Sequence, residues 1–381
     1  MARKAAGIYK RKDGTYCNRF TVNGKRYAVY GKSVPECRAK EAERRQQIAE
    51  GMLKSGKNQK LSEYAETWID NKHGTVKETT IYTEKRLFSV ISKVVLDDVG
   101  TVFGDLTLGT VEPQNIRDVQ RILSNTLTTN STNQCISLLS SMFNAAIRDR
   151  LITFNPTAGV KPLKRTEEQA RNTIHRALTK KETTIFLEIA KNGMEEKNIS
   201  KSWYYNLYVF LLHTGCRIGE AGAVMAKDIS NGVLTVSRTV TRDESGTRIL
   251  GEETKTAAGR RTIPLTAEAL KAIADQRELE SMFGNGIIAF NKPIFRTQNG
   301  SLLETPGINS NIARICEAVG IERFTCHAFR DTFATRCVES GMQAKTLQEI
   351  LGHTDINMTM ALYAHAMEDT KVEQINAVKF G

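Results

Sequence analysis

The feature that most constrains the fold is the uneven distribution of charge along the chain. The 381-residue sequence has a net charge of +12, and residues 1–60 hold 16 Lys and Arg against 5 Asp and Glu. Nearly all of the net positive charge therefore lies in the first 60 residues. A chain of this length has room for two or three domains. We therefore expect a separate basic module at the N-terminus rather than one domain around a single core.

Turn signals divide residues 7–31 of this module into three short β-strands. Asp13-Gly14 marks a turn, and Asn23-Gly24 is the strongest short signal for a hairpin. Residues 34–50 then form a charged helical pattern. Because the charge on the exposed strand face has one sign, we expect that face to enter a DNA major groove. A solvated basic surface without a ligand is the alternative. The candidate DNA-binding residues are Lys10, Arg11, Lys12, Arg19, Lys25 and Arg26.

The remaining chain is predicted to be mainly helical. Apolar residues recur at helical spacing from Leu61 onward, which predicts an all-helical domain over residues 61–160. Residues 51–60 and 161–176 have the composition of linkers. From residue 177 the pattern is mixed, with a capping box at Thr179 and Glu182 and β-like segments at 233–242 and 260–265.

The expected fold class is multidomain α+β. Residues 1–55 would form a small basic three-stranded sheet plus a helix, and residues 61–160 an all-helical domain. Residues 177–381 would form a mainly helical domain with a small β-sheet.

Composition disfavours several kinds of protein. The cysteines are odd in number, seven, and none forms a C-x-x-C pair, so we expect reduced, buried thiols rather than disulfides or a zinc site. No apolar run is long enough to span a bilayer, and no signal peptide is visible, so we expect a cytoplasmic protein. No acidic cluster resembles a two-metal nuclease site, and neither a metal nor a cofactor is expected.

Two cationic side chains in the C-terminal region could meet a phosphate. Arg217 follows a Thr214-Gly215 break, and a guanidinium presents a planar fork of donors that suits a phosphate. Its structural alternative is a salt bridge with Glu220, one turn later. Lys255 precedes the second β-like segment, where it could reach a DNA backbone or simply be solvated.

Three further signals follow along the chain. His327 and Arg330 share one helix face at i, i+3 spacing, although a buried histidine beside a salt-bridged arginine would give the same pattern. Gly352 before His353 indicates a tight turn that presents the imidazole ring. Tyr363 lies on a helix with apolar neighbours, where a tyrosine usually belongs to the core.

Taken in order, these signals resemble the tyrosine recombinase (phage integrase) family, most closely the phage and conjugative-transposon integrases. The matching words are TGCRIGE, TKTAAGRRTIPL, HAFRDTFATR and LGHTDINMTMALYAH, within residues 177–370. No expected catalytic position departs from the pattern. The resemblance implies a site-specific DNA recombinase that cleaves and rejoins strands through a covalent 3′-phosphotyrosine. Such an enzyme integrates and excises a mobile element without metal or ATP.

The resemblance also implies a role for each matched residue. Tyr363 would be the nucleophile, and Arg217 and Arg330 would bind the negative charge that builds up on the phosphate in the transition state. Since a free tyrosine has a pKa near ~10, the nucleophile needs help to lose its proton. Lys255 would protonate the leaving 5′-oxygen, His327 would act as the base or assist it, and His353 would donate to the phosphate.

The same resemblance implies partners and domain roles. Residues 1–55 would bind arm-type DNA, residues 61–160 the core site, and residues 177–381 would be catalytic. Double-stranded DNA, a homotetramer on DNA, an excisionase and a host DNA-bending protein are the implied partners, and the bacterial nucleoid is the implied location. A type IB topoisomerase is disfavoured by the separate N-terminal module, and a non-catalytic DNA-binding regulator by the complete set of matched residues.

The C-terminal tail has an apolar stripe of its own. Val372, Ile375 and Val378 approximate one helical face between charged residues. A short terminal helix is marginal alone and needs a surface to pack on. That surface would belong either to its own catalytic domain or to a neighbouring protomer.

Overall fold

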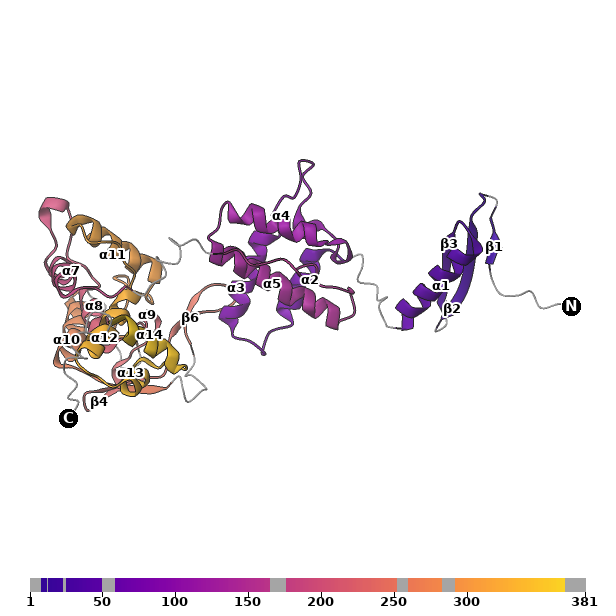
Figure 1. The fold of residues 1–381 in the computed structure, drawn as a ribbon. Coiled ribbons are helices and arrows are strands. Elements are labelled where there is room, and N and C mark those ends of the chain that lie inside the picture. Colours follow the sequence, from indigo (N-terminus) through magenta and orange to yellow (C-terminus); the bar gives the residue numbers. More distant parts are fainter. Residues whose placement is uncertain are drawn as a thin grey trace, which may run out of the picture. The chain divides into compact units, whose positions relative to one another are not determined.

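The computed structural model describes residues 8–11, 13–22, 25–49, 59–164, 176–251, 260–282 and 292–366 (Figure 1). The chain divides into two compact units, Met1–Glu168 and Gln169–Gly381, and the boundary falls within the predicted linker at 161–176. Helices predominate and the sheets are small, so the expected α+β class is confirmed. The finer limits 1–55, 61–160 and 177–381 stay predictions.

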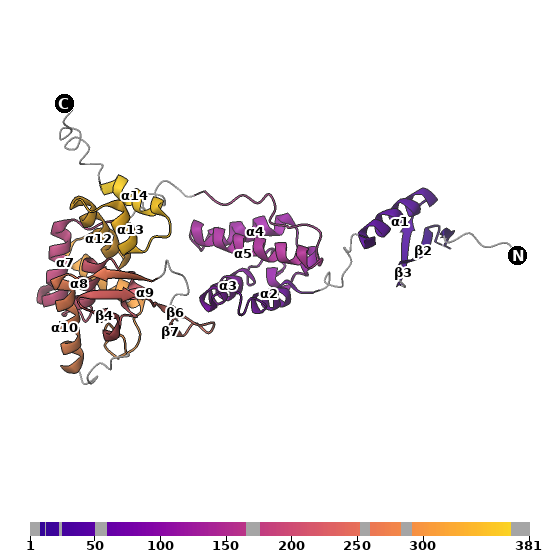
Figure 2. The same cartoon turned by 90° about the horizontal axis from the view of Figure 1, so that it is seen from below.

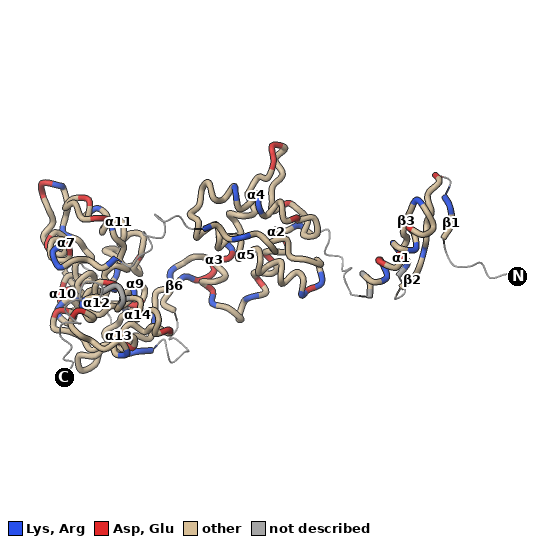
Figure 3. Tube along the Cα trace, viewed as in Figure 1, with Lys and Arg blue, Asp and Glu red and all other residues tan. Residues whose placement is uncertain are grey.

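The N-terminal sheet is antiparallel in the order β1-β2-β3, as the turn signals predict. Its elements are β1 (Ile8–Lys10), β2 (Tyr16–Val22), β3 (Lys25–Gly31) and α1 (Val34–Ala49). Helix α1 packs on one face, where Asn18 donates to Glu41 and the Arg45 guanidinium lies over the Phe20 ring. Because side chains alternate along a strand, Cys17 and Arg19 of β2 lie on the opposite, open face. In Figure 3, Lys and Arg recur along the strands, whereas α1 carries both charge signs.

Helices and short 3-10 turns make up residues 59–164 of the first unit. They are α2 (Leu61–Asp70), α3 (Glu78–Ile91), η2 (Phe103–Asp105), η3 (Leu108–Thr110), α4 (Pro113–Ser124) and α5 (Thr129–Arg148). The predicted stripe on α2 is buried at Leu61, Tyr64 and Ile69. Helix α5 begins where the Thr128 hydroxyl accepts a hydrogen bond from the Ser131 amide. The helical prediction for this region is therefore confirmed.

In its described residues, the second unit combines helices with two small sheets (Figure 2). Its helices are α7 (Lys180–Asn192), α8 (Tyr205–Thr214), α9 (Ile218–Ala221), α10 (Ala267–Met282), α11 (Thr305–Val319), α12 (His327–Glu339), α13 (Ala344–Leu351) and α14 (Ile356–Ala366), with the 3-10 turns η4 (Glu195–Lys197) and η5 (Ala226–Asp228). Its strands are β4 (Ile229–Ser230), β5 (Val233–Val236), β6 (Val240–Arg242), β7 (Arg248–Leu250) and β8 (Arg261–Pro264). The capping box at Thr179 and Glu182 opens α7 as predicted.

The core of this unit fixes α12 against α7 and α8. The aromatic rings of Phe186, Tyr208 and Phe329 lie 5.2–5.7 Å apart. Farther along α12, the Thr332 hydroxyl accepts from the Leu178 amide at 2.8 Å and Arg336 donates to the Leu178 carbonyl at 2.7 Å. Helix α12, which carries two of the predicted site residues, is thus held along its length.

The prediction of one β segment over residues 233–242 is wrong. Strand β5 pairs with β8, whereas β6 pairs with β7 in a separate hairpin. The break lies at residues 237–239, where the Arg238 side chain turns to a buried pair with Asp228 at 2.6 Å. The β-propensity pattern continues through this point because Thr and Val flank it, although β5 ends at Val236 and β6 begins at Val240.

The expectations drawn from composition can be compared with the fold. All seven cysteines are buried and free, as expected. Within the described ranges, no helix is long and apolar enough to cross a membrane. Among those same residues, no group of three His, Cys, Asp or Glu side chains is placed to hold a metal ion.

Candidate active site

The turn between α8 and α9 sets up the first site residue. Gly215 ends α8 with a φ of +63°, in the left-handed region that favours glycine. A side chain at this position would also collide with the ring of Phe333 on α12. The chain can therefore turn tightly against α12 and deliver Arg217 to the start of α9.

Arg217 is paired with Glu220, as its structural alternative predicted. The Arg217 amide donates to Glu220 Oε2 at 2.9 Å, and its Nη1 donates to Glu220 Oε1 at 3.0 Å. The Arg217 side chain nevertheless remains 43% exposed. Because Glu220 engages only part of the fork, the guanidinium keeps an accessible edge for an anion.

Arg330 is buried and joins two loops to α12. Its Nη1 donates to the Gly215 carbonyl at 2.7 Å, and its Nη2 donates to the Leu351 carbonyl at 2.6 Å. Burial and the nearby Arg217 lower the pKa of Arg330 to about 10, so the group stays charged at neutral pH. The two arginines, which are distant in sequence, therefore place positive charge in one region.

The two predicted histidines lie on or next to elements that Arg330 connects, α12 and the end of α13. His327 begins α12, one turn before Arg330, and its Nε2 lies 3.8 Å from Asp331 Oδ1. His353 follows Gly352, which ends α13 with a φ of +66°, so the predicted tight turn is confirmed. The His353 Nδ1 shares a hydrogen bond of 2.9 Å with the Thr359 hydroxyl on α14. That contact fixes the ring and leaves Nε2 as its other polar atom.

Arg261 completes the network, and the sequence reasoning missed it. Its Nη1 and Nη2 donate to the two carboxylate oxygens of Glu220 at 3.0 and 2.7 Å, and its Nε donates to the Ile350 carbonyl at 2.6 Å. A signal for it was present in the strand pattern: Arg261 and Ile263 alternate onto the same, inward face of β8. An arginine at an inward strand position needs a partner, and here Glu220 supplies it.

The Tyr363 hydroxyl is bound to a backbone carbonyl rather than to a site arginine. Its ring packs against the hydrophobic cluster that contains Cys337 and Leu351, and its hydroxyl donates to the Met342 carbonyl beyond the end of α12. Helical rise puts roughly 13 Å between Arg330 and Glu339 at that end of α12. Burial and the neighbouring Cys337 raise the pKa of Tyr363, so its hydroxyl is protonated at neutral pH.

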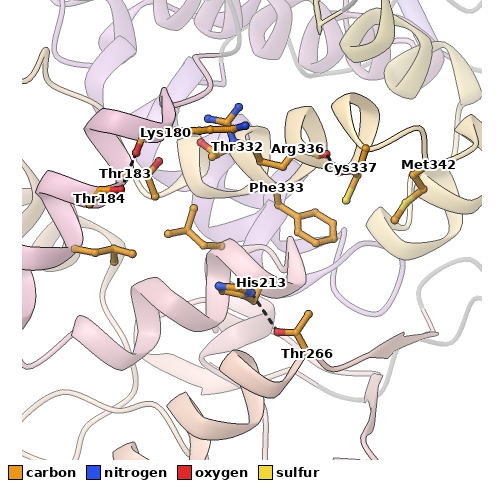
Figure 4. A pocket seen from close by; sticks show the side chains of 13 residues that line it. Lys180, Thr183, Thr184, His213, Thr266, Thr332, Phe333, Arg336, Cys337 and Met342 are labelled. Carbon is orange, nitrogen blue, oxygen red and sulfur yellow. Dashed lines mark hydrogen bonds between the residues drawn. The ribbon is translucent and has the colours of Figure 1, made fainter.

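A cavity of about 490 Å³ is lined mainly by residues of α7, α8 and α12 (Figure 4). One lining residue, Cys337, belongs to the hydrophobic cluster against which Tyr363 packs, and two others, Phe333 and Met342, pack against the same cluster. On the other side, His213 shares a hydrogen bond of 3.1 Å with Thr266. None of the residues that form this cavity is Arg217, Arg330 or His353, so it is distinct from the arginine site.

Lys255 lies outside the described residues, between β7 and β8. Its predicted role therefore stays a prediction.

The predicted DNA-binding residues of the N-terminal sheet fall into three groups: those on the open face, one on the face that carries α1, and two outside the described residues. Arg11 lies over the ring of Tyr30 at 5.3 Å, and Arg19 over the ring of Tyr9 at 5.7 Å. Arg26 is exposed and opposite Thr21, on the same open face as Arg19.

The prediction that all six basic residues share the open face is wrong for Lys10. Its side chain lies over the Tyr16 ring, on the face that carries α1. Lys12 and the side chain of Lys25 lie outside the described residues.

Comparison with known proteins places this architecture in a family. The sequence pattern that defines the phage integrase family matches residues 176–369, more than half of the chain. The chain therefore belongs to the phage integrase family. Over 97% of its length it is 26% identical to the transposase from transposon Tn916 of Enterococcus faecalis, of which it covers 93%. It is also 28% identical to prophage integrase IntR of Escherichia coli, over 65% of this chain and 60% of that protein.

Solved structures agree with this assignment. The structure of the Tn1549 transposon integrase in complex with transposon right end DNA matches with a TM-score of 0.65 and 26% identity, over 84% of this chain and 99% of that one. A lambda integrase tetramer bound to a Holliday junction matches in fold, with a TM-score of 0.58 and 18% identity over 95% and 96% of the two chains. The protein is a tyrosine recombinase of the conjugative-transposon integrase type, a DNA strand transferase.

Proposed function

We propose that Arg217, Arg330 and His353 together form the binding site for the phosphate at which this enzyme cleaves DNA. The observation that carries the proposal is the hydrogen-bond network that joins the start of α9, the first turn of α12 and the end of α13. Fixed cationic donors stabilise the charge that develops on a phosphate without having to reorganise during the reaction. In other phosphoryl-transfer enzymes, metal ions stabilise this developing charge.

The reaction assigned to this site is a transesterification. The Tyr363 oxygen forms a bond to phosphorus while the bond from phosphorus to the 5′-oxygen breaks, which leaves a 3′-phosphotyrosine and a 5′-hydroxyl. His327 accepts or helps to transfer the tyrosine proton, and Lys255 supplies a proton to the leaving oxygen. Because one ester replaces another, the 5′-hydroxyl of a second strand can reverse the step without ATP.

Cleavage at this site requires Tyr363 to leave the Met342 carbonyl. Its hydroxyl is hydrogen-bonded to the Met342 carbonyl, beyond the end of α12, and its ring packs against the hydrophobic cluster that contains Cys337 and Leu351. Helix α14 must therefore shift or unwind to bring the oxygen to a phosphate. Its link to the site is the hydrogen bond between Thr359 and His353, so binding at His353 and the position of α14 are connected.

The other parts of the chain supply DNA binding and assembly. The open face of the N-terminal sheet offers guanidinium groups over tyrosine rings to arm-type DNA, and the helical domain and catalytic domain bind the core site. The working unit is a homotetramer on two duplexes, a proposal supported by the likeness to tetrameric lambda integrase on DNA. An excisionase and a host DNA-bending protein control the direction of integration and excision of the mobile element.

The test is the capture of the covalent intermediate. The full chain is incubated with nicked duplexes made from the joined ends of the element that encodes it, in the presence of a chelator. A protein–DNA adduct that survives detergent and disappears after protease treatment is expected. Cleavage that needs added magnesium and leaves no adduct would instead indicate hydrolysis by a metal-dependent nuclease.

A further inference from the structure

Glu220 is shared between two arginines, and this sharing sets the charge of the site. Each carboxylate oxygen accepts one hydrogen bond from Arg217 and one from Arg261. Burial disfavours the ionised form of Glu220, but the hydrogen bonds and charges of Arg261 and Arg217 outweigh it, so its pKa lies below the ordinary value. Glu220 is thus an anion that neutralises only one of its two arginine partners.

The balance of charge shows what Arg261 contributes. Arg217, Arg261 and Arg330 bring three positive charges, and Glu220 brings one negative charge, which leaves two positive charges in the cluster. Without Arg261, the whole charge of Glu220 would act on Arg217. The guanidinium of Arg217 would then be held and neutralised by the carboxylate instead of meeting a phosphate.

Arg261 also supports the turn that presents His353. Its Nε donates to the Ile350 carbonyl, and a Cβ added at Gly352 would lie 2.9 Å from its Cδ. The backbone of Gly352 therefore rests directly on the arginine side chain. Since Arg330 binds the next carbonyl, that of Leu351, two buried arginines hold this turn.

We propose that Arg261 is a positioning residue for DNA cleavage, which keeps Arg217 available to the phosphate by sharing Glu220 and which holds the His353 turn. The inference rests on the proposed roles of Arg217 and His353. Arg261 itself is 8% exposed and turned toward Glu220 and Ile350, so it acts through these partners rather than on the DNA. A buried ion pair with a purely structural role would contribute to folding without affecting Arg217.

The test is a pair of variants in the full chain, measured for single-turnover cleavage of the nicked substrate. In Arg261→Met, cleavage is expected to fall by on the order of 10²-fold while DNA affinity changes little, as when a preorganised donor is lost. In the double variant Arg261→Met/Glu220→Gln, Arg217 is no longer held by a full carboxylate charge. Cleavage is then expected to recover by at least about tenfold, a coupling typical of residues in one network.

Two further variants separate this role from folding. Arg238→Met removes a comparable buried arginine, 10% exposed and paired with Asp228, and is expected to lower the melting temperature without slowing cleavage by folded protein. Arg261→Lys keeps the positive charge and is expected to retain more cleavage activity than Arg261→Met. It also provides a test of the inference if the Met variant does not fold.

Three outcomes would overturn the inference: cleavage by Arg261→Met within threefold of wild type, a double variant no faster than the single one, or Arg261→Lys no more active than Arg261→Met. Arg217→Ala tests the underlying assignment separately. Normal cleavage by that variant would refute the proposed phosphate site itself, whatever Arg261 does.

Discussion

At the scale of single residues, Arg217 and Arg330 differ most in burial. Arg217 is 43% exposed at its side chain, whereas Arg330 is 3% exposed and binds two backbone carbonyls. In the proposed phosphate site, removing either guanidinium would take away a donor to the transition state. Only the loss of Arg330 also leaves buried carbonyls without their partner, and that costs folding free energy.

We therefore predict that Arg217→Ala and Arg330→Ala both slow cleavage by roughly 10²–10³-fold, far more than they weaken binding. Arg330→Ala should also be destabilised, by about 1–3 kcal/mol for each orphaned carbonyl, whereas Arg217→Ala should melt near the wild-type temperature. Single-turnover cleavage, DNA affinity and thermal melting measure the three quantities. Variants that lose affinity and cleave normally once bound would show that these arginines only hold DNA.

The pKa of Glu220 predicts how stability depends on pH. Because the folded protein holds this pKa below its ordinary value, the ionised carboxylate stabilises the fold above pH ~4.5, and the contribution is lost as pH falls through the folded pKa. Glu220→Gln lacks the contribution at every pH. The melting-temperature difference between wild type and Glu220→Gln should therefore be largest near neutral pH and shrink toward pH 3. A difference that stays constant over this range would contradict the assigned pKa shift.

Motif order allowed the proposed phosphate-binding residues to be named from the sequence, but not how they are placed in the fold. Arg217, Arg330 and His353 each lie in a short motif with its own local geometry, so the sequence could propose them. Arg261 was missed because its importance depends on Glu220, 41 positions away in sequence. The position of Tyr363 could not be predicted, since it depends on how α14 packs against α12 and α13.

At the scale of elements, the N-terminal sheet was predictable because its turns have strong local signals. The sequence could not show which basic residues share a face, because that depends on the strand register. In the structure, Arg11, Arg19 and Arg26 lie on the open face and Lys10 lies on the other. The division of residues 233–242 into β5 and β6 was not predictable from local propensity, because Arg238 at the break pairs with Asp228, which lies outside the segment.

We predict that the open face binds arm-type DNA mainly through phosphates. Arg19→Ala in the full chain should weaken binding to arm DNA and reduce the log–log salt slope by about 0.9, the value for one phosphate contact. Arg38→Ala, an exposed position on α1, is the matched control and should bind almost as well as wild type. Equal losses in the two variants would indicate a general effect of charge rather than a binding face.

The same element can be removed as a whole. A protein that begins at residue 61 should cleave core-only substrate at the wild-type rate and should recombine arm-bearing attachment sites poorly. The reason is that arm contacts raise the local concentration of the catalytic domain at the core site. Equal recombination of arm-bearing sites by the truncated and full-length proteins would contradict an arm-binding role.

At the scale of the whole molecule, we expect the tail to connect cleavage to assembly. The apolar stripe of residues 372–378 lies outside the described residues, and it follows α14 closely, so any surface that binds it would also act on Tyr363. We predict that deleting residues 369–381 weakens cooperative assembly on paired sites and deregulates cleavage, while binding to a single site survives. Gel-shift assays with one and two sites measure this. Wild-type synapsis and recombination by the shortened protein would favour packing of the tail on its own domain.

The central claim is that the Tyr363 oxygen becomes joined to DNA, although it rests on the Met342 carbonyl in the free protein. The most direct measurement compares Tyr363→Phe with wild type and with Tyr205→Phe, a control tyrosine on α8, on a nicked suicide substrate resolved on a denaturing gel. Tyr363→Phe should bind DNA almost normally and form no covalent adduct, whereas Tyr205→Phe should form it at the wild-type yield. A wild-type yield of adduct from Tyr363→Phe would remove Tyr363 as the nucleophile.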